Sequence, residues 1–264
     1  MAIPAKVSKR LVDGIKRFKP IVSKARDKDV NESDTVTIIA DILSEVFGYD
    51  KYTEITSEFA VKKTFCDLAI SLDGTPRLLI EAKAAGLNLK EQYIKQAVDY
   101  GSNSGIEWVV LTNSVQWMVY KIIFGKPISS ELVYSFDFTQ VNPKNESELE
   151  LLYYLTKEAL SKSGKASLDE YRTHKQILNR FVISQVLLSA PVLDAVRKTI
   201  KKISPDAKGT NEEIYKIINE EIIKRDVLDD ERTASVKKMV TRALNSEKKP
   251  EKPKTSTTSV VLPD

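Results

Sequence analysis

A pair of apolar segments joined by a turn sequence constrains the fold of this chain more than any other feature. Residues 65–72 (FCDLAISL) and 77–84 (RLLIEAKA) have the length and the apolar composition of strands. Asp73 and Gly74 stand between them, and this dipeptide favours a tight turn. The two segments therefore predict an antiparallel, largely buried β-hairpin.

Three charged side chains interrupt this apolar hairpin. Side chains alternate between the two faces of a strand, so Glu81 and Lys83 project from the same face. Asp67 lies among the apolar residues of the preceding strand. A structural alternative is an ordinary Glu/Lys pair on an exposed sheet face. Because an apolar hairpin has no need of these charges, we predict that Asp67, Glu81 and Lys83 are catalytic residues.

The register of the hairpin decides whether the two acids meet. Asp67 lies opposite Glu81 if the loop has an odd number of residues, as in 73–75. A strict two-residue turn would turn Asp67 to the other face of the sheet. Pro76 lacks the N–H that the ladder of such a turn requires. We therefore expect the three-residue loop, with a bulge at Gly74.

Two acids and a lysine on one face of a sheet suit phosphodiester hydrolysis. Carboxylates are hard oxygen ligands of the kind that Mg²⁺ prefers. The metal lowers the pKa of a bound water and stabilises charge at the phosphate. Lys83 would orient the attacking water or neutralise the developing negative charge. We predict a Mg²⁺ site, with Mn²⁺ as a possible substitute, in which Asp67 and Glu81 are ligands.

Hydrophobic periodicity predicts helices and strands in a definite order. The first helix is expected to be interrupted at Pro20, because proline removes a helical hydrogen bond. From residue 146 to residue 245 the pattern is helical. Before that, the expected elements are helices at 1–31 and 32–47, strands at 52–59, 65–72 and 77–84, a helix at 89–103, and strands at 107–113 and 116–123.

Asp67 followed by Glu81-Ala82-Lys83 fits the D…(E)xK signature of the PD-(D/E)xK nuclease superfamily. Segments 67–86, 96–100 and 109–122 resemble the N-terminal nuclease domain of type I restriction endonuclease R subunits. The resemblance implies an α/β, restriction-endonuclease-like fold. Its three-layer core would be a mixed central sheet flanked by helices, here with an added all-helical C-terminal region.

The resemblance also implies roles for residues outside the hairpin. Gln96 and Tyr100 occupy the family's QxxxY motif, where they would support the lysine or contact the nucleic-acid backbone. The structural alternative is a surface glutamine and a partly buried tyrosine. Glu32 is the expected third metal ligand, from the helix before the sheet, and Glu45 is the alternative. Cys66 stands where the family often has proline.

The function implied is that of a Mg-dependent DNA endonuclease in restriction or phage defence. R subunits couple this domain to an ATP-driven motor, and no Walker-type phosphate loop occurs in this sequence. We therefore expect a stand-alone nuclease or one directed by a specificity or motor protein. The alternatives are a non-cleaving module that binds nucleic acid or a partner through the same fold, and a scaffold built on the helical half.

Charge is distributed unevenly along the 264 residues. Residues 1–31 hold nine Lys/Arg and three Asp/Glu, residues 32–164 hold twelve and nineteen, and residues 165–264 hold twenty and fifteen. Basic flanks around an acidic middle suit a phosphodiesterase, although solvated helix faces give the same pattern. The predicted domains are a basic helical segment (1–31), a nuclease-like domain (32–164), a helical region (165–245) and a disordered tail (246–264).

The helical region has two possible roles that the sequence leaves open. Its cations Arg197, Lys198, Lys201 and Lys202 would suit nucleic-acid binding, and the region could instead form a homo-oligomer interface. One cysteine and one histidine exclude an internal disulfide and a Cys/His zinc site. The sequence has neither a run of about 18 apolar residues nor a secretory signal, so we expect a cytoplasmic protein without membrane contact.

Overall fold

The computed structural model describes residues 3–61, 64–161 and 166–246. The chain divides into two compact units, Met1–Arg172 and Thr173–Asp264. The predicted domain boundaries after residues 31, 164 and 245 stay predictions. The predicted tail falls outside the described residues except for Ser246, which ends the last helix.

A mixed sheet forms the centre of the first unit. The six strands found among the described residues lie in chain order across it: β1 (Ile55–Val61), β2 (Thr64–Leu72), β3 (Thr75–Ala82), β4 (Trp108–Thr112), β5 (Gln116–Ile123) and β6 (Ser129–Asp137). β3 and β4 run parallel, and the other neighbours run antiparallel. A parallel pair needs a crossover, which η1 (Glu91–Ile94) and α3 (Lys95–Ser104) supply.

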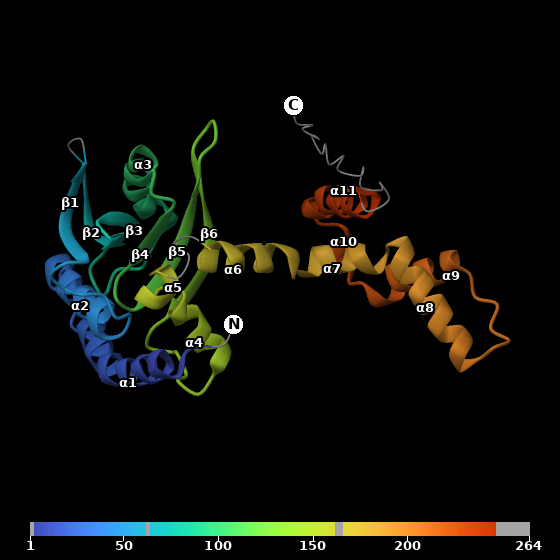
Figure 1. Cartoon of the computed structure of the whole chain (residues 1–264), viewed down its shortest axis with the longest axis horizontal. Helices are drawn as coiled ribbons and strands as arrows, with labels where there is room; N and C mark the ends of the chain where they lie inside the picture. Colours follow the sequence, from blue (N-terminus) through green and yellow to red (C-terminus); the bar gives the residue numbers. More distant parts are fainter. Residues whose placement is uncertain (1–2, 62–63, 162–165, 247–264) are drawn as a thin grey trace, which may run out of the picture. The chain divides into compact units, whose positions relative to one another are not determined.

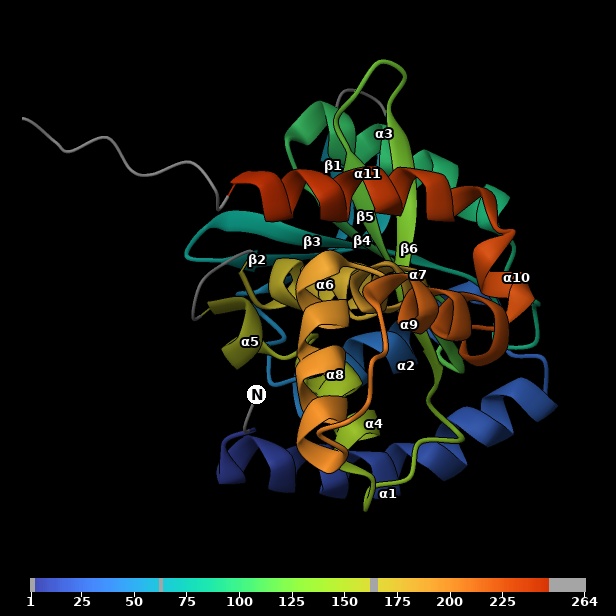
Figure 2. The same cartoon turned by 90° about the vertical axis from the view of Figure 1, so that its right-hand side faces the viewer.

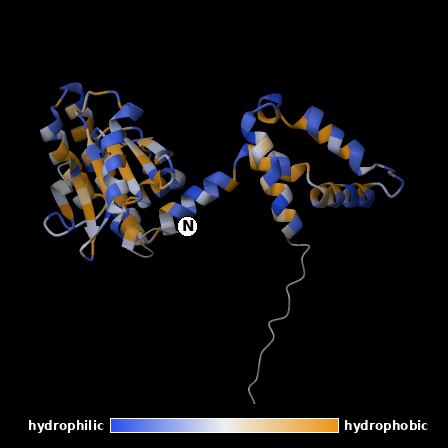
Figure 3. Cartoon of the chain, turned by 90° about the horizontal axis from the view of Figure 1, so that it is seen from above, coloured by the Kyte–Doolittle hydropathy of each residue, from blue (hydrophilic) through white to orange (hydrophobic). Residues whose placement is uncertain are grey.

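Helices cover both faces of this sheet, as Figures 1 and 2 show. On one face, α1 (Ala5–Asp27) and α2 (Glu32–Glu45) share a hydrophobic cluster with alternate residues of the hairpin, among them Leu68, Leu78 and Ile80. On the other face, α3 packs with the intervening residues, including Ala69 and Leu79. Figure 3 shows hydrophobic residues concentrated along these strands. The predicted α/β fold with a flanked mixed sheet is confirmed.

Short helices complete the first unit. They are α4 (Glu146–Tyr153), α5 (Lys157–Ser161) and α6 (Ala166–Ile177), the last of which continues into the second unit. Arg10 of α1 donates to the carbonyl oxygens of Val46 and Phe47 at 3.0 and 3.2 Å, and it forms an ion pair with Glu158 of α5 at 2.6 Å. These contacts fix α1 and α5 at the C-terminal end of α2.

The predicted interruption of the first helix is wrong, because α1 continues through Pro20. The proline is exposed, and so is Lys16, whose carbonyl loses its helical partner. Water can therefore solvate that carbonyl, which makes proline tolerable on the outer face of a helix. The second helix begins at Glu32 as expected, where the Asn31 side chain caps it by accepting from the Asp34 N–H at 2.9 Å.

The hairpin turn also differs from the expectation. The predicted loop at 73–75 is wrong, because Leu72 pairs with Thr75 and leaves a two-residue turn. Asp73 and Gly74 have φ angles of 52° and 71°. Two successive positive φ values characterise a type I′ turn, whose twist matches that of the flanking strands.

A bulge within β3 gives the register in which Asp67 can lie opposite Glu81. Ile70 pairs with Leu78 but its neighbour Ser71 pairs with Pro76, so Arg77 is the extra residue, and beyond the bulge Leu68 pairs with Ile80. Asp67 is the neighbour of Leu68 and Glu81 is the neighbour of Ile80, so the two acids are next to each other in this register. The expected opposition of the two acids therefore comes from a bulge inside the strand and not from an odd loop.

Gly74→Ala is expected to lower the free energy of unfolding by about 1 kcal/mol, because an L-residue is strained at this φ. No atom lies within 4 Å of the position that the new Cβ would take, so the backbone strain acts alone. Urea unfolding measures the change. Asp73→Asn is the matched control, since asparagine also adopts positive φ. A Gly74→Ala chain as stable as the wild type would contradict this account of the turn.

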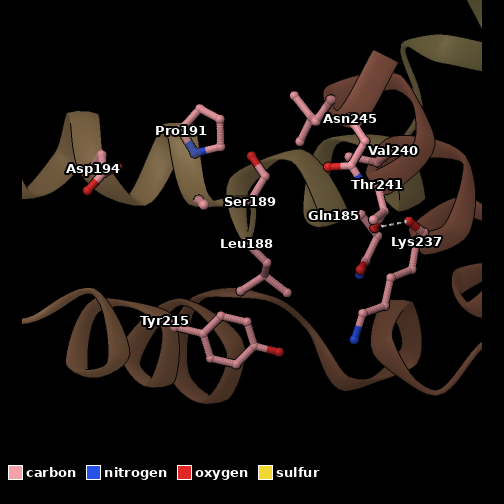
Figure 4. Close-up of a pocket in the computed structure, with 12 residues that line it drawn as sticks. Gln185, Leu188, Ser189, Pro191, Asp194, Tyr215, Lys237, Val240, Thr241 and Asn245 are labelled. Carbon is pink, nitrogen blue, oxygen red and sulfur yellow. Dashed lines mark hydrogen bonds between the residues drawn. The ribbon is translucent and has the colours of Figure 1, made fainter. Parts of the chain in front are cut away.

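The second unit is helical, which confirms the predicted helical C-terminal region. Its elements are α7 (Arg180–Leu187), α8 (Ala190–Ile203), α9 (Asn211–Ile217), the π-helical turn η2 (Ile218–Ile222), α10 (Arg225–Leu228) and α11 (Glu231–Ser246). Leu193, Ile214 and Ile218 form a small buried cluster between α8 and α9. This unit has a hollow of about 560 Å³, whose lining residues include Leu188 and Tyr215 (Figure 4).

No helix in the described parts of the chain has both the length and the apolar character that crossing a membrane requires.

Candidate active site

The C-terminal end of β3 brings the three predicted catalytic residues together. Lys83 Nζ donates to Glu81 Oε1 at 2.7 Å and to the Ala82 carbonyl oxygen at 2.7 Å. Asp67 Oδ2 accepts from the Ala82 N–H, also at 2.7 Å. The two carboxylates and the ammonium are therefore arranged around the backbone of a single residue, Ala82.

Side chains hold Asp67 at this place by completing the β2–β3 ladder. Backbone pairing between the two strands ends at Leu68 and Ile80. Beyond that point the Asp67 carboxylate takes the N–H of Ala82, and the Cys66 thiol donates to the Ile80 carbonyl oxygen at 3.1 Å. Because buried backbone groups need partners, these bonds fix the Asp67 carboxylate at the end of β3.

Glu32 approaches the same lysine from the first turn of α2. Its Oε2 lies 3.5 Å from Lys83 Nζ, and its side chain is half exposed, at 50%. The loop before α2 is tied to the chain after β3, since the Ala85 N–H donates to the Val30 carbonyl oxygen at 3.0 Å. The alternative acid, Glu45, lies at the other end of α2, where it forms an ion pair with Arg17.

Burial governs the electrostatics of this cluster. It raises the pKa of Glu81, which is 6% exposed, and the hydrogen bond from Lys83 opposes the rise only in part. The charges of Asp67 and Glu32 act in the same direction as burial. For Lys83, burial lowers the pKa, but the hydrogen bond to Glu81 and the charges of Glu32 and Asp67 raise it to a net value above the usual one.

These groups form an acidic site whose chemistry fits a divalent cation. With all of them ionised, the three carboxylates exceed the one ammonium by two negative charges. Carboxylate and backbone carbonyl oxygens are hard donors of the kind that Mg²⁺ prefers, and Mg²⁺ keeps several waters when bound. Because burial raises the pKa of Glu81, a cation bound beside this carboxylate would stabilise its ionised form.

The predicted set of three metal ligands is not gathered into one group. Within residues 3–61, 64–161 and 166–246, no three His, Cys, Asp or Glu side chains lie close enough together to hold a metal ion. Glu32 lies near Lys83, and Asp67 is anchored on the N–H of Ala82. Glu81 and the Ala82 carbonyl oxygen both accept hydrogen bonds from Lys83 Nζ.

The two residues of the predicted QxxxY motif lie on α3 in different environments. Tyr100 is buried in the cluster between α3 and the sheet, where Cys66 also packs. Burial and the nearby Cys66 raise the pKa of Tyr100, and a hydrogen bond with Ser104 lowers it in part. Gln96, one turn earlier, is exposed. The structure therefore buries Tyr100 between α3 and the sheet and leaves Gln96 at the surface.

Asn113 is a positioning residue that the sequence argument missed. It is buried at the end of β4, where its Nδ2 donates to the Leu87 carbonyl oxygen at 2.8 Å and its Oδ1 accepts from the Gln116 N–H at 2.7 Å. Beside it, the Lys83 N–H donates to the Thr112 carbonyl oxygen at 2.9 Å. The end of β4 thus fixes the backbone that follows Lys83. The Asn113-Ser114 turn was the available signal, but it indicated only a turn.

Comparison with known families gives a match for the segment that carries most of these residues. Residues 36–132 match the family described as type I restriction enzyme R protein N terminus. The matched span runs from α2 into β6 and contains Asp67, Glu81, Lys83, Gln96 and Tyr100, but not Glu32. The resemblance predicted from the sequence is confirmed for this segment. Neither the curated proteins nor the solved structures include a match to the chain.

Proposed function

We propose that this chain is a metal-dependent endonuclease that hydrolyses phosphodiester bonds in DNA. The observation that carries the proposal is the cluster at the end of β3, where Lys83 contacts the buried Glu81 and Asp67 is anchored beside them. The match of residues 36–132 to the N terminus of a restriction enzyme subunit supports a restriction-related nuclease. The proposed setting is restriction or phage defence.

Each residue of the cluster has a proposed role. Asp67 and Glu81 would hold Mg²⁺ or Mn²⁺, with Glu32 contributing from α2. When bound, the metal would supply positive charge beside the phosphate and lower the pKa of water. Lys83, oriented by Glu81, would place its ammonium against the negative charge that develops on the phosphate oxygens. Gln96, exposed on α3, would contact the nucleic-acid backbone, and Tyr100 would support the sheet by packing between it and α3.

A partner is part of the proposal. The matched family is the N terminus of one subunit of a larger enzyme, and the helical second unit lies outside the matched span. A specificity or motor protein would direct the nuclease to its substrate, or the chain would act as a homo-oligomer.

The test is cleavage of plasmid DNA by the full chain. Supercoiled plasmid should become nicked or linear with Mg²⁺ or Mn²⁺, and EDTA should abolish the product because the acids alone lack the required positive charge. Asp67→Asn, purified identically, controls for a contaminating nuclease and should give no product.

Two results would contradict the proposal. One is no cleavage of supercoiled, linear, single-stranded or methylated DNA, with or without added partner proteins. The other is DNA binding that is steeply salt-dependent, independent of divalent metal and without product, which would indicate a non-cleaving binding module.

A further inference from the structure

The second unit carries a basic surface that the proposed catalytic cluster does not use. We call it the α8 basic surface, and it consists of Arg197, Lys198, Lys201 and Lys202 of α8 and Lys208 of the following loop. The four lysines are exposed and form no ion pair within the described part of the chain. Asp206 is the only acid between residues 197 and 208. The surface therefore carries several uncompensated positive charges.

Part of this surface is concave. Arg197, Lys201 and Lys208 line a hollow of about 690 Å³ together with the loop between α8 and α9. Asp206 is the one acid among the residues that line it. Asp194 holds two of the lining residues, because it accepts from Arg197 Nη2 at 3.1 Å and from Asn211 Nδ2 at 2.9 Å. One cation is thus held in place by its partners, while the lysines are free to reach an anion.

The spacing of the cations suits a repeating anion. Arg197 and Lys201 lie four residues apart on α8, and so do Lys198 and Lys202. Residues at this spacing are neighbours on one face of a helix, about one turn apart. Two adjacent rows of cations on a rigid helix can contact successive phosphates of a nucleic-acid backbone, whereas a single small anion would use only the hollow.

We propose that the α8 basic surface binds the phosphate backbone of the DNA substrate. The second unit would then hold the polyanion for the cleaving site of the first unit. The inference rests on the proposed function for the identity of the substrate. It accounts for a feature that the matched segment, residues 36–132, does not contain.

The test measures DNA binding by the full chain in EDTA, so that no cleavage occurs. Fluorescence anisotropy with a labelled duplex gives the affinity as a function of salt concentration. Lys201→Ala combined with Lys208→Ala should make the slope of log K against log salt shallower by about 2, since each lost phosphate contact removes about 0.9. At about 0.1 M salt the same slope predicts a loss of affinity of roughly tenfold to a hundredfold. The loss should be equal for duplexes of different sequence, because phosphates carry no base identity.

Lys224→Ala combined with Lys238→Ala is the matched control. Both lysines are exposed in the same unit and neither lines the hollow. This pair removes the same charge and should leave the affinity within about twofold of the wild type if phosphate contacts are local. An equal loss in both pairs would show an effect of net charge alone and would overturn the proposal. Unchanged DNA binding in Lys201→Ala/Lys208→Ala would also overturn it. The alternative would then be that the α8 basic surface binds an acidic protein.

Failure of this inference and failure of the proposed function are distinguishable. If the wild type cleaves DNA with Mg²⁺ but the Lys201→Ala/Lys208→Ala chain binds normally in EDTA, only the α8 basic surface is refuted. If no DNA is cleaved but the same pair weakens binding while the control pair does not, the nuclease proposal fails and the binding surface stands.

Discussion

Replacing Lys83 with methionine is expected to reduce the rate of DNA cleavage by about 10²- to 10³-fold, the usual effect of removing one group that stabilises charge in a transition state. Methionine keeps most of the apolar stem but cannot donate to Glu81 or offer charge to a phosphate. DNA binding should persist, because the cations of the α8 basic surface remain. The loss should therefore fall on the cleavage step and not on the affinity for DNA.

Single-turnover cleavage with enzyme in excess measures this step, and anisotropy in EDTA measures binding. Lys90→Met is the matched control, because Lys90 is exposed and lies a few residues after the site. Thermal unfolding of both variants separates catalysis from folding, since the Lys83 change leaves the buried Glu81 without its ion pair. A folded Lys83→Met chain that cleaves like the wild type would remove Lys83 from the proposed site.

The second large effect is on stability. Trp117→Ala is expected to lower the free energy of unfolding by about 3–5 kcal/mol, the range for deleting a large buried aromatic side chain. Trp117 is fully buried in β5, and its Nε1 donates to the Ser114 carbonyl oxygen at 2.9 Å. Its ring packs edge-on against the ring of Phe47, with 5.4 Å between the ring centroids, and stacks on the ring of Phe136, with 6.1 Å between the centroids. Phe47 follows α2, so the loss also loosens the helix that carries Glu32.

Urea unfolding followed by the fluorescence of the remaining tryptophan, Trp108, measures this effect within the sheet. Phe124→Ala provides the control, because that ring is 51% exposed just after the same strand and should change stability by less than about 0.5 kcal/mol. A decrease below about 1 kcal/mol for Trp117→Ala would mean that the packing around Phe47 and Phe136 is not as described.

Most strands and helices of the first unit could be predicted from the sequence, because each has a clear hydrophobic or turn pattern within a few residues. Alternation identified β2, β3 and β5, and the Asp73-Gly74 dipeptide identified the hairpin. The sequence did not predict β6 (Ser129–Asp137), whose apolar run is short and whose residues are exposed or half-buried at all positions except Tyr134. Its strand conformation depends on pairing with β5, a partner that only the folded sheet supplies.

The register of the hairpin could be predicted only in part from the local sequence. For Asp67 to face Glu81, the pairing of the two strands must contain one irregularity, and the sequence analysis expected it in the loop at 73–75. The backbone satisfies that requirement with a bulge at Arg77 of β3, opposite Ile70 and Ser71, so the turn keeps its favoured two-residue form. A bulge in an apolar strand has no sequence signature comparable to Asp-Gly.

The sequence by itself determined which residues are candidates for catalysis, because strand alternation and the acid–acid–lysine spacing act within one hairpin. Only the tertiary structure decided how Asp67, Glu81 and Lys83 meet. The bulge and the capture of the Ala82 N–H by Asp67 set the geometry inside the hairpin, and the approach of Glu32 from α2 joins segments that are distant along the chain. Such contacts depend on the packing of whole elements, and no short stretch of sequence contains that information.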